Sequence, residues 1–333
     1  MMSNQRRFIG WALVSASLII HAFTVWCYAT QPDSLAAFTV LPFWFWGAIG
    51  LITSAFAFCF LRAPLSLILT AVWAVTLSVA MDEARVLSHF GSPAITPERK
   101  ITTDGTTSIR VATINCADFA FGTPIRDLEK WNPDIVLIQQ AFPHQTKAIT
   151  DALFGAGGDY RAYMTNGIAT RFQIQREIRN PTMHNQQVTL RLPNGREIEV
   201  VNVHLASAAT DLRLWSKKAR ATHRLNRDLR KKELAIVLQV LEQTTNFPNT
   251  PAILGGDFNA GATDIVHRQI TPAFDDAFAE VGRGWGNTFH RRFPILRIDH
   301  IYATRQLQPQ SCGTAVSKNT DHRIVIADFL LPK

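Results

Sequence analysis

The chain has 333 residues, which is too long for one small core and suits one large domain with an appendage. It is basic, with a formal net charge of +8, and 47% of its residues are hydrophobic. The charges are unevenly spread: none lies between Arg7 and Asp33, between Asp33 and Arg62, or between Arg62 and Asp82. This distribution excludes a single soluble domain of uniform composition.

Each uncharged run exceeds the roughly 18 apolar residues that indicate a bilayer span. We therefore predict three transmembrane helices, at about residues 8–28, 38–61 and 64–81. A cleaved signal peptide is the alternative for the first run. Its apolar region is too long for that, and two further runs follow it.

The positive charges around these runs predict an orientation. Arg6 and Arg7 precede the first run and Arg62 lies between the second and third, whereas the loop around Asp33 has no Lys or Arg. Positive residues favour the cytoplasmic side. We therefore expect a multi-pass protein of the plasma (inner) membrane, in contact with the lipid bilayer, whose chain after Met81 lies outside the cytoplasm.

Residues 82–108 contain Pro, Gly and a Thr-rich stretch, which is typical of a tether rather than a packed element. The sequence thus predicts a three-span anchor over residues 1–81, a linker over 82–108 and a soluble domain over 109–333. The chain after Met81 has a net charge of about +6.

The soluble part alternates apolar strands with helices. Helices are expected at about residues 124–131, 144–154 and 211–244, and an Asn-Gly turn joins a hairpin of residues 188–192 and 198–203. Further strands are expected at 109–115, 135–138, 252–257, 298–302 and 324–329. Because helices and hairpins both occur, we predict an α/β sandwich with mixed sheets. Cys116 and Cys312 lie in this part, either as a disulfide or as two buried thiols.

Polar residues stand at the ends of several of these strands. They form five clusters: Asn115; Gln140; His204; Asp257 with Asn259; and Asp299 with Asp321 and His322. Each alone is typical of a turn or of a satisfied core residue. Five clusters at one edge of a sheet would be costly unless they form a common polar site, because buried polar groups need partners.

These segments resemble the endonuclease/exonuclease/phosphatase superfamily, the DNase I-like metal-dependent phosphoesterases. The matching pieces occur in the family's order: residues 113–115, 134–140, 202–205, 256–259, 297–300 and 320–323. The resemblance implies a four-layer α/β sandwich with one divalent ion, Mg²⁺ or Mn²⁺. It also implies hydrolysis of a phosphoric ester by in-line attack of water.

The resemblance also implies roles for individual residues. Asp257 would orient or deprotonate the attacking water, and Asn259 would hold Asp257 and the phosphate. His204 would stabilise charge on the phosphoryl group. His322 would contact a phosphate oxygen, with its other ring nitrogen fixed by Asp299.

The metal ligands implied by the resemblance are Asn115, Gln140 and Asp321. At Gln140 this sequence departs from the family pattern, in which a glutamate is a principal metal ligand. A glutamine offers a carbonyl oxygen but no negative charge, so metal affinity should fall. Two hypotheses follow: an active phosphoesterase, or a non-catalytic phosphate-binding domain.

The long helix after His204 is strongly basic in its first half, where Arg220 and Arg224 are candidate substrate-binding residues. The alternative is a solvated face, or one attracted to anionic lipid. The spans make the chain similar to membrane-anchored bacterial members of the family. We therefore expect a lipid-linked phosphate as substrate, with an extracytoplasmic nuclease acting on nucleic acid as the alternative; no protein partner is indicated.

Overall fold

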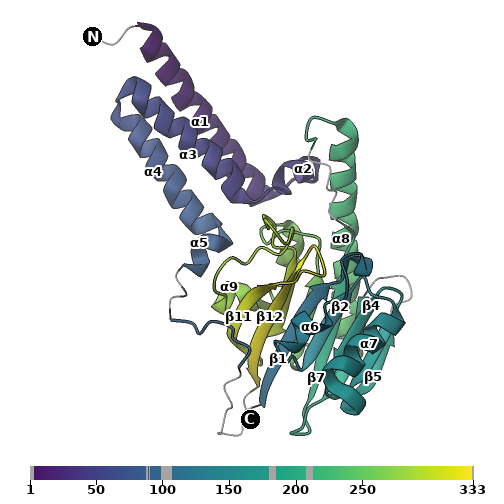
Figure 1. The fold of residues 1–333 in the computed structure, drawn as a ribbon. Coiled ribbons are helices and arrows are strands. Elements are labelled where there is room, and N and C mark those ends of the chain that lie inside the picture. The colour runs from purple at the N-terminus through teal and green to yellow at the C-terminus, as the bar shows by residue number, and fades with distance from the viewer. Residues whose placement is uncertain are drawn as a thin grey trace.

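The computed structural model describes residues 4–87, 89, 91–98, 107–179, 185–207 and 213–331. Three apolar helices form a bundle that projects from a β-rich part (Figure 1). They are α1 (Asn4–Thr30), α3 (Phe43–Leu61) and α4 (Pro64–Ala80). A short 3-10 helix, η1 (Asp33–Leu35), and α2 (Ala36–Thr39) join α1 to α3.

Two of the three expected spans are long and apolar enough to cross a bilayer, among the residues that the structure describes. They are α1, with 27 residues, and α3, with 19. The third, α4, is an apolar helix of 17 residues. The second span begins at Phe43 rather than near residue 38, because Pro42 is extended and separates α2 from α3.

The strands among the described residues form two six-stranded sheets. The first has the order β11-β12-β1-β2-β4-β3, formed by β11 (Gln308–Val316), β12 (Arg323–Leu331), β1 (Thr107–Asn115), β2 (Ile135–Gln139), β4 (Asn166–Thr170) and β3 (Asp159–Tyr163). The second has the order β5-β6-β7-β8-β10-β9, formed by β5 (Gln173–Arg179), β6 (Asn185–Arg191), β7 (Glu197–His204), β8 (Ala252–Asp257), β10 (Asp299–Thr304) and β9 (Phe274–Asp276). Parallel pairs are β1 with β2 and β7 with β8.

The sheets pack face to face because their strands alternate side chains between two buried surfaces. On β2, Leu137 contributes to the core between the sheets and Ile138 to the core on the outer face. Burial on both faces explains why β2 reads as a continuous apolar run. Helices α6 (Ile125–Glu129) and α7 (Pro143–Phe154) cover the outer face of the first sheet.

Helix α8 (Lys217–Thr244) covers the outer face of the second sheet with its carboxyl-terminal half. The order is therefore helices, sheet, sheet, helix, which is the mixed α/β sandwich expected from the sequence. A shorter helix, α9 (Ala277–Val281), lies against β11 and β10.

The described part of the expected tether is partly packed. Residues 82–86 form α5 (Asp82–Val86), Val86 is buried in the core between the sheets, and Ile95 packs on the outer core of the first sheet. Residues 88, 90 and 99–106 of the tether lie outside the described residues. The composition did not indicate this packing, because Val86 and Ile95 lie in a stretch with Gly, Pro and charged residues and without a periodic apolar pattern.

Strands β3, β4, β5, β9 and β11 were not expected from the sequence. β5 is an edge strand with mostly polar and mostly exposed residues, so it lacks an apolar pattern. β4 begins with Asn-Gly, which is typical of a turn, but every one of its residues is buried. Cys116 and Cys312 are both buried free thiols.

Candidate active site

The site is organised around the carboxyl end of β8. Asp257 is the last residue of that strand; His204 lies opposite it on the parallel strand β7, and Asp299 lies opposite it on the antiparallel strand β10. Three neighbouring strands therefore present these side chains in one row. Gly256 precedes Asp257 with φ of +135°, and a Cβ atom there would lie 2.0 Å from the carbonyl oxygen of Val203. Only glycine fits this position.

The first sheet supplies Asn115, at the end of β1. Its Nδ2 donates to Asp257 Oδ2 at 2.9 Å, and its Oδ1 accepts from the backbone N–H of Ala117 at 2.9 Å. Asn115 therefore joins the two sheets at the site. Its carbonyl accepts from the hydroxyl of Thr320 at 2.6 Å, which holds the loop that carries His322.

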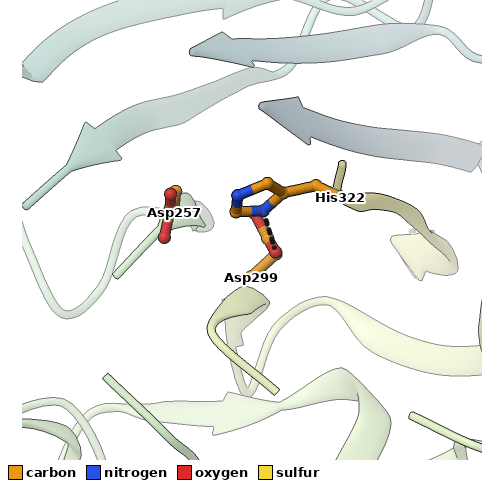
Figure 2. A group of neighbouring side chains, drawn as sticks. All are labelled: Asp257, Asp299 and His322. Atoms are coloured by element: carbon orange, nitrogen blue, oxygen red, sulfur yellow. Dashed lines mark hydrogen bonds and ion pairs between the residues drawn. The ribbon is translucent and has the colours of Figure 1, made fainter. Parts of the chain in front are cut away.

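His322 and Asp299 form a buried dyad. The imidazole Nδ1 lies 2.8 Å from Asp299 Oδ2, although the two residues come from the loop before β12 and from the start of β10. Figure 2 shows the His322 ring hydrogen-bonded to Asp299, with its other nitrogen on the side of Asp257. Burial opposes the charged imidazole, but Asp299, Asp257 and Asp321 outweigh it and raise the pKa of His322 to about 9.

Asp257 is buried, with 1% of its surface exposed. Burial and the neighbouring charge of Asp299 raise its pKa, and His322, His204 and the hydrogen bond from Asn115 oppose that rise. Its Oδ1 accepts from the backbone N–H of Asn259 at 2.8 Å. The carboxylate is thus fixed in position and holds its proton more tightly than an exposed aspartate.

Asn259 and His204 complete this row. Asn259 holds Asp257 through its backbone, whereas its side-chain amide donates to the carbonyl of Leu205 at 3.0 Å. His204 Nε2 lies 3.9 Å from Asp257 Oδ2, and 16% of its side chain is exposed. His204 therefore lies on the solvent side of the buried carboxylate.

A group of side chains with metal-ligand chemistry lies at the centre. Asp257, Asp299 and His322 each offer a ligand atom, and these atoms lie within 4.8 Å of one another. Asp299 Oδ1 is buried without a hydrogen-bond partner. A buried carboxylate oxygen without a partner is costly, and a hard cation would satisfy it. The residues therefore fit a divalent ion.

Two of the three ligands implied by the family pattern interact with this group. Asn115 bonds to Asp257, and Asp321 is half-buried and raises the pKa of His322. Gln140 follows the last residue of β2, which pairs with Asn115, and it has a φ of +51° and a half-buried side chain. Gln140 is thus at the strand-end position expected from the sequence, without a charge.

No supporting role was predicted from the sequence for two further groups. Gln139 donates to the side chain of Asn202 at 2.6 Å, and the Asn202 amide donates to the carbonyl of Ile138 at 2.9 Å, which ties β2 to β7 beneath the site. Thr288 Oγ1 accepts from the backbone N–H of Asp299 at 3.2 Å. Neither group stands out locally, because each links residues far apart in the chain.

Arg220 and Arg224 lie elsewhere. They line a groove of about 510 Å³ together with Asp33 and Ser34, the residues that follow α1. None of the strand-end residues around Asp257 lines this groove. The guanidinium of Arg220 donates to the carbonyl of Leu214 at 2.8 Å. The structure thus groups the two arginines with the loop after α1 and not with Asp257.

The two facing sheets, with a carboxylate, histidine and amide cluster at their strand ends, define a DNase I-like α/β sandwich. The model of the Endonuclease/Exonuclease/phosphatase family matches residues 124–322, more than half of the chain. The chain belongs to this family, whose members are hydrolases that act on phosphoric ester bonds and generally depend on a divalent metal ion.

Solved structures share this fold. An endonuclease/exonuclease/phosphatase family protein from Bacteroides thetaiotaomicron is 20% identical, with a TM-score of 0.53 over 68% of this chain and 99% of that chain. A mannosyl-6-phosphatase from the same organism is 19% identical, with a TM-score of 0.51 over 66% and 99%. D. rerio TDP2 with a single-strand DNA product is 15% identical, with a TM-score of 0.51 over 67% and 99%. No curated protein sequence matches the chain.

Proposed function

We propose that this chain is a membrane-anchored, metal-dependent phosphoesterase that hydrolyses a phosphate ester outside the cytoplasm. The observation that supports this most strongly is the pairing of two groups with shifted pKa values. The pKa of Asp257 is raised, which suits a base, and the pKa of His322 is raised to about 9, which keeps it a proton and hydrogen-bond donor at neutral pH.

The side chains divide the reaction between them. Asp257 takes a proton from the attacking water, since its oxygens keep lone pairs beyond the bonds from Asn115 and Asn259. His322 donates to a phosphate oxygen, and Asp299 keeps its ring in place. His204 lies on the exposed side, where it donates to the incoming phosphoryl group.

A divalent ion, Mg²⁺ or Mn²⁺, would be held by the unpartnered oxygen of Asp299 together with Asn115, Gln140 and Asp321. When bound, such an ion stabilises negative charge on the phosphoryl oxygens. Gln140 gives the site one negative charge fewer than the family pattern. Gln140 therefore supports the alternative, a domain that binds phosphate without hydrolysing a phosphate ester.

The proposed organisation is a three-span anchor over residues 1–81, a linker over 82–108 and the enzymatic domain over 109–333. α1, α3 and the shorter α4 support an anchor in the plasma membrane, and the arginines near their ends support a domain outside the cytoplasm. At that location the accessible esters are phospholipids, lipid-linked pyrophosphates and extracellular nucleic acid. We propose a lipid-linked phosphate, with nuclease activity as the alternative.

Turnover of bis(p-nitrophenyl) phosphate by the full chain in detergent tests the chemistry. We expect hydrolysis that needs Mg²⁺ or Mn²⁺ and falls by about 10²–10⁴-fold in Asp257→Asn, the range for loss of a general base. Asp151→Asn is a matched control, because that carboxylate is exposed on α7. Unchanged turnover in Asp257→Asn would contradict the site.

The Gln140→Glu variant separates the two functions. An active wild type that needs less Mg²⁺ after the substitution supports a phosphoesterase with a weakened metal site. An inert wild type that gains activity supports the binding domain. A comparison of polyprenyl pyrophosphate, phospholipid and single-stranded DNA then ranks the substrates, and protease added to intact cells tests whether the domain lies outside.

A further inference from the structure

Helix α8 has two halves with different surroundings. In its carboxyl-terminal half, Leu234, Val237 and Leu241 are buried against the second sheet. In its amino-terminal half the two leucines are exposed: 57% of Leu225 and 39% of Leu229 are accessible. Trp215, immediately before the helix cap at Ser216, is 78% exposed. The first half of α8 therefore extends beyond the sheet.

This half of α8 runs beside the ends of the apolar helices. Lys231 forms an ion pair with Asp33 at 2.9 Å, three residues after the end of α1. Arg227 donates to the hydroxyl of Thr39, four residues before α3 begins. The amino-terminal end of α8 continues past these contacts, and Figure 1 shows it rising beside α2. It thus stands at the end of the helix bundle.

The side chains at this end have the chemistry of a bilayer surface contact. Residues 213–229 contain six Arg or Lys and one acidic residue, Asp228. Lys217, Lys218 and Arg224 are exposed, and the two lysines follow the exposed Trp215 by two and three residues in the chain. Tryptophan favours the boundary between headgroups and acyl chains, and nearby cations favour anionic lipid.

We propose that the amino-terminal end of α8, here called the α8 tip (residues 215–225), binds the anionic surface of the bilayer. The inference rests on the membrane anchoring proposed above. Charge complementarity and continuity with the helix bundle identify the occupant. The bilayer surface lies where the bundle would enter the membrane, and the α8 tip presents beside that entry cations and an indole, which complement anionic headgroups.

Residues of α8 beyond the α8 tip connect it with the active site. Glu233 on α8 accepts from the backbone N–H of Ala206 at 2.7 Å, and Asn226 donates to the carbonyl of Ser207 at 2.7 Å. Ala206 and Ser207 lie two and three residues after His204, the last residue of β7. A bilayer contact through the α8 tip therefore holds the segment beside His204 close to the membrane, where a lipid-linked phosphate would approach.

The test uses the full chain in nanodiscs with brominated acyl chains, which quench nearby indoles. The discs contain phosphatidylcholine alone, or phosphatidylcholine with phosphatidylglycerol. The difference in emission between wild type and Trp215→Phe isolates Trp215 from the other tryptophans. We expect Trp215 to be quenched in the anionic discs and much less in the neutral discs.

Charge reversal tests the role of the lysines. Lys217→Glu with Lys218→Glu should abolish the quenching of Trp215 in anionic discs. Lys130→Glu with Lys147→Glu is the matched control, because these lysines are also exposed but lie on the far sheet, after α6 and on α7. The control pair should leave the quenching unchanged.

The outcomes separate this inference from the function. If the chain co-elutes with discs but Trp215 is not quenched, or is quenched equally in neutral and anionic discs, the α8 tip does not bind anionic lipid. If single-stranded DNA rather than lipid changes Trp215 emission, the tip is a nucleic-acid contact and the inference is wrong. If the chain does not enter discs, the anchoring and this inference both fail. Absence of phosphodiester turnover beside normal quenching refutes the activity alone.

Discussion

The Asp299–His322 dyad makes a quantitative prediction about pH. Replacement of Asp299 by Asn keeps the size of the side chain but removes the negative charge that lies 2.8 Å from the His322 ring. In the wild type the pKa of His322 is raised from 6.5 to about 9, even though burial lowers it. Without Asp299, burial dominates, and we expect the pKa of His322 to fall toward or below 6.5.

The sign of the stability effect follows from linkage. A histidine whose pKa is higher in the folded state stabilises the fold fully below its unfolded pKa of 6.5 and loses that contribution as the pH rises to about 9. The rise corresponds to about 3 kcal/mol, at about 1.4 kcal/mol for each pH unit. In metal-free protein, the stability cost of Asp299→Asn should therefore be larger by about 3 kcal/mol below pH 6.5 than above pH 9.

Two measurements check this prediction. The first is the unfolding midpoint of the wild type and Asp299→Asn across that pH range, with EDTA present and Asp151→Asn as the exposed control. The second is the titration of the His322 ring by NMR, assigned with His322→Gln. A His322 midpoint that is the same in the wild type and in Asp299→Asn would refute the reasoning.

Three further substitutions test the packing. Gly256→Ala should prevent stable folding, because the φ of Gly256 is positive and a Cβ atom there would lie 2.0 Å from a carbonyl oxygen of β7. Gly261 has open space around it, so Gly261→Ala should melt as the wild type does. Equal melting of the two variants would contradict this prediction. Arg297→Met leaves the carboxylate of Asp82 without its ion pair at 2.6 Å and should cost about 3–5 kcal/mol in thermal unfolding, a result excluded by a wild-type melting curve. Leu137→Ala opens a cavity between the sheets and should lower stability by about 2–5 kcal/mol in denaturant titrations; a loss below about 1 kcal/mol would mean that the core refills.

Local sequence determined the central strands. β2 and the first half of β8 are apolar because both of their faces are buried, and this composition can be recognised in the sequence without any knowledge of the fold. The polar residues at the strand ends could also be recognised in the sequence, because Asp257 and Asn115 each end a predicted strand. The edge strand β5 could not be recognised in this way, since its stability comes from pairing with β6 and not from its own side chains.

The tertiary structure decided which of these residues meet. The family resemblance predicts that Asp299 holds His322, but nothing in the sequence indicates that Asn115 reaches Asp257 from the other sheet, or that Thr288 supports the start of β10. Those contacts depend on strand register, which sets side chains opposite one another over long chain separations.

The basic half of α8 shows the difference most clearly. Its charges are evident in the sequence, but Arg220 and Arg224 read equally well as part of a substrate cleft or of a solvated face. The structure places them beside Asp33 and Ser34, after the first apolar helix. The physical reason is that helix periodicity fixes which side chains share a face, whereas the partner of that face is fixed by how the whole chain packs.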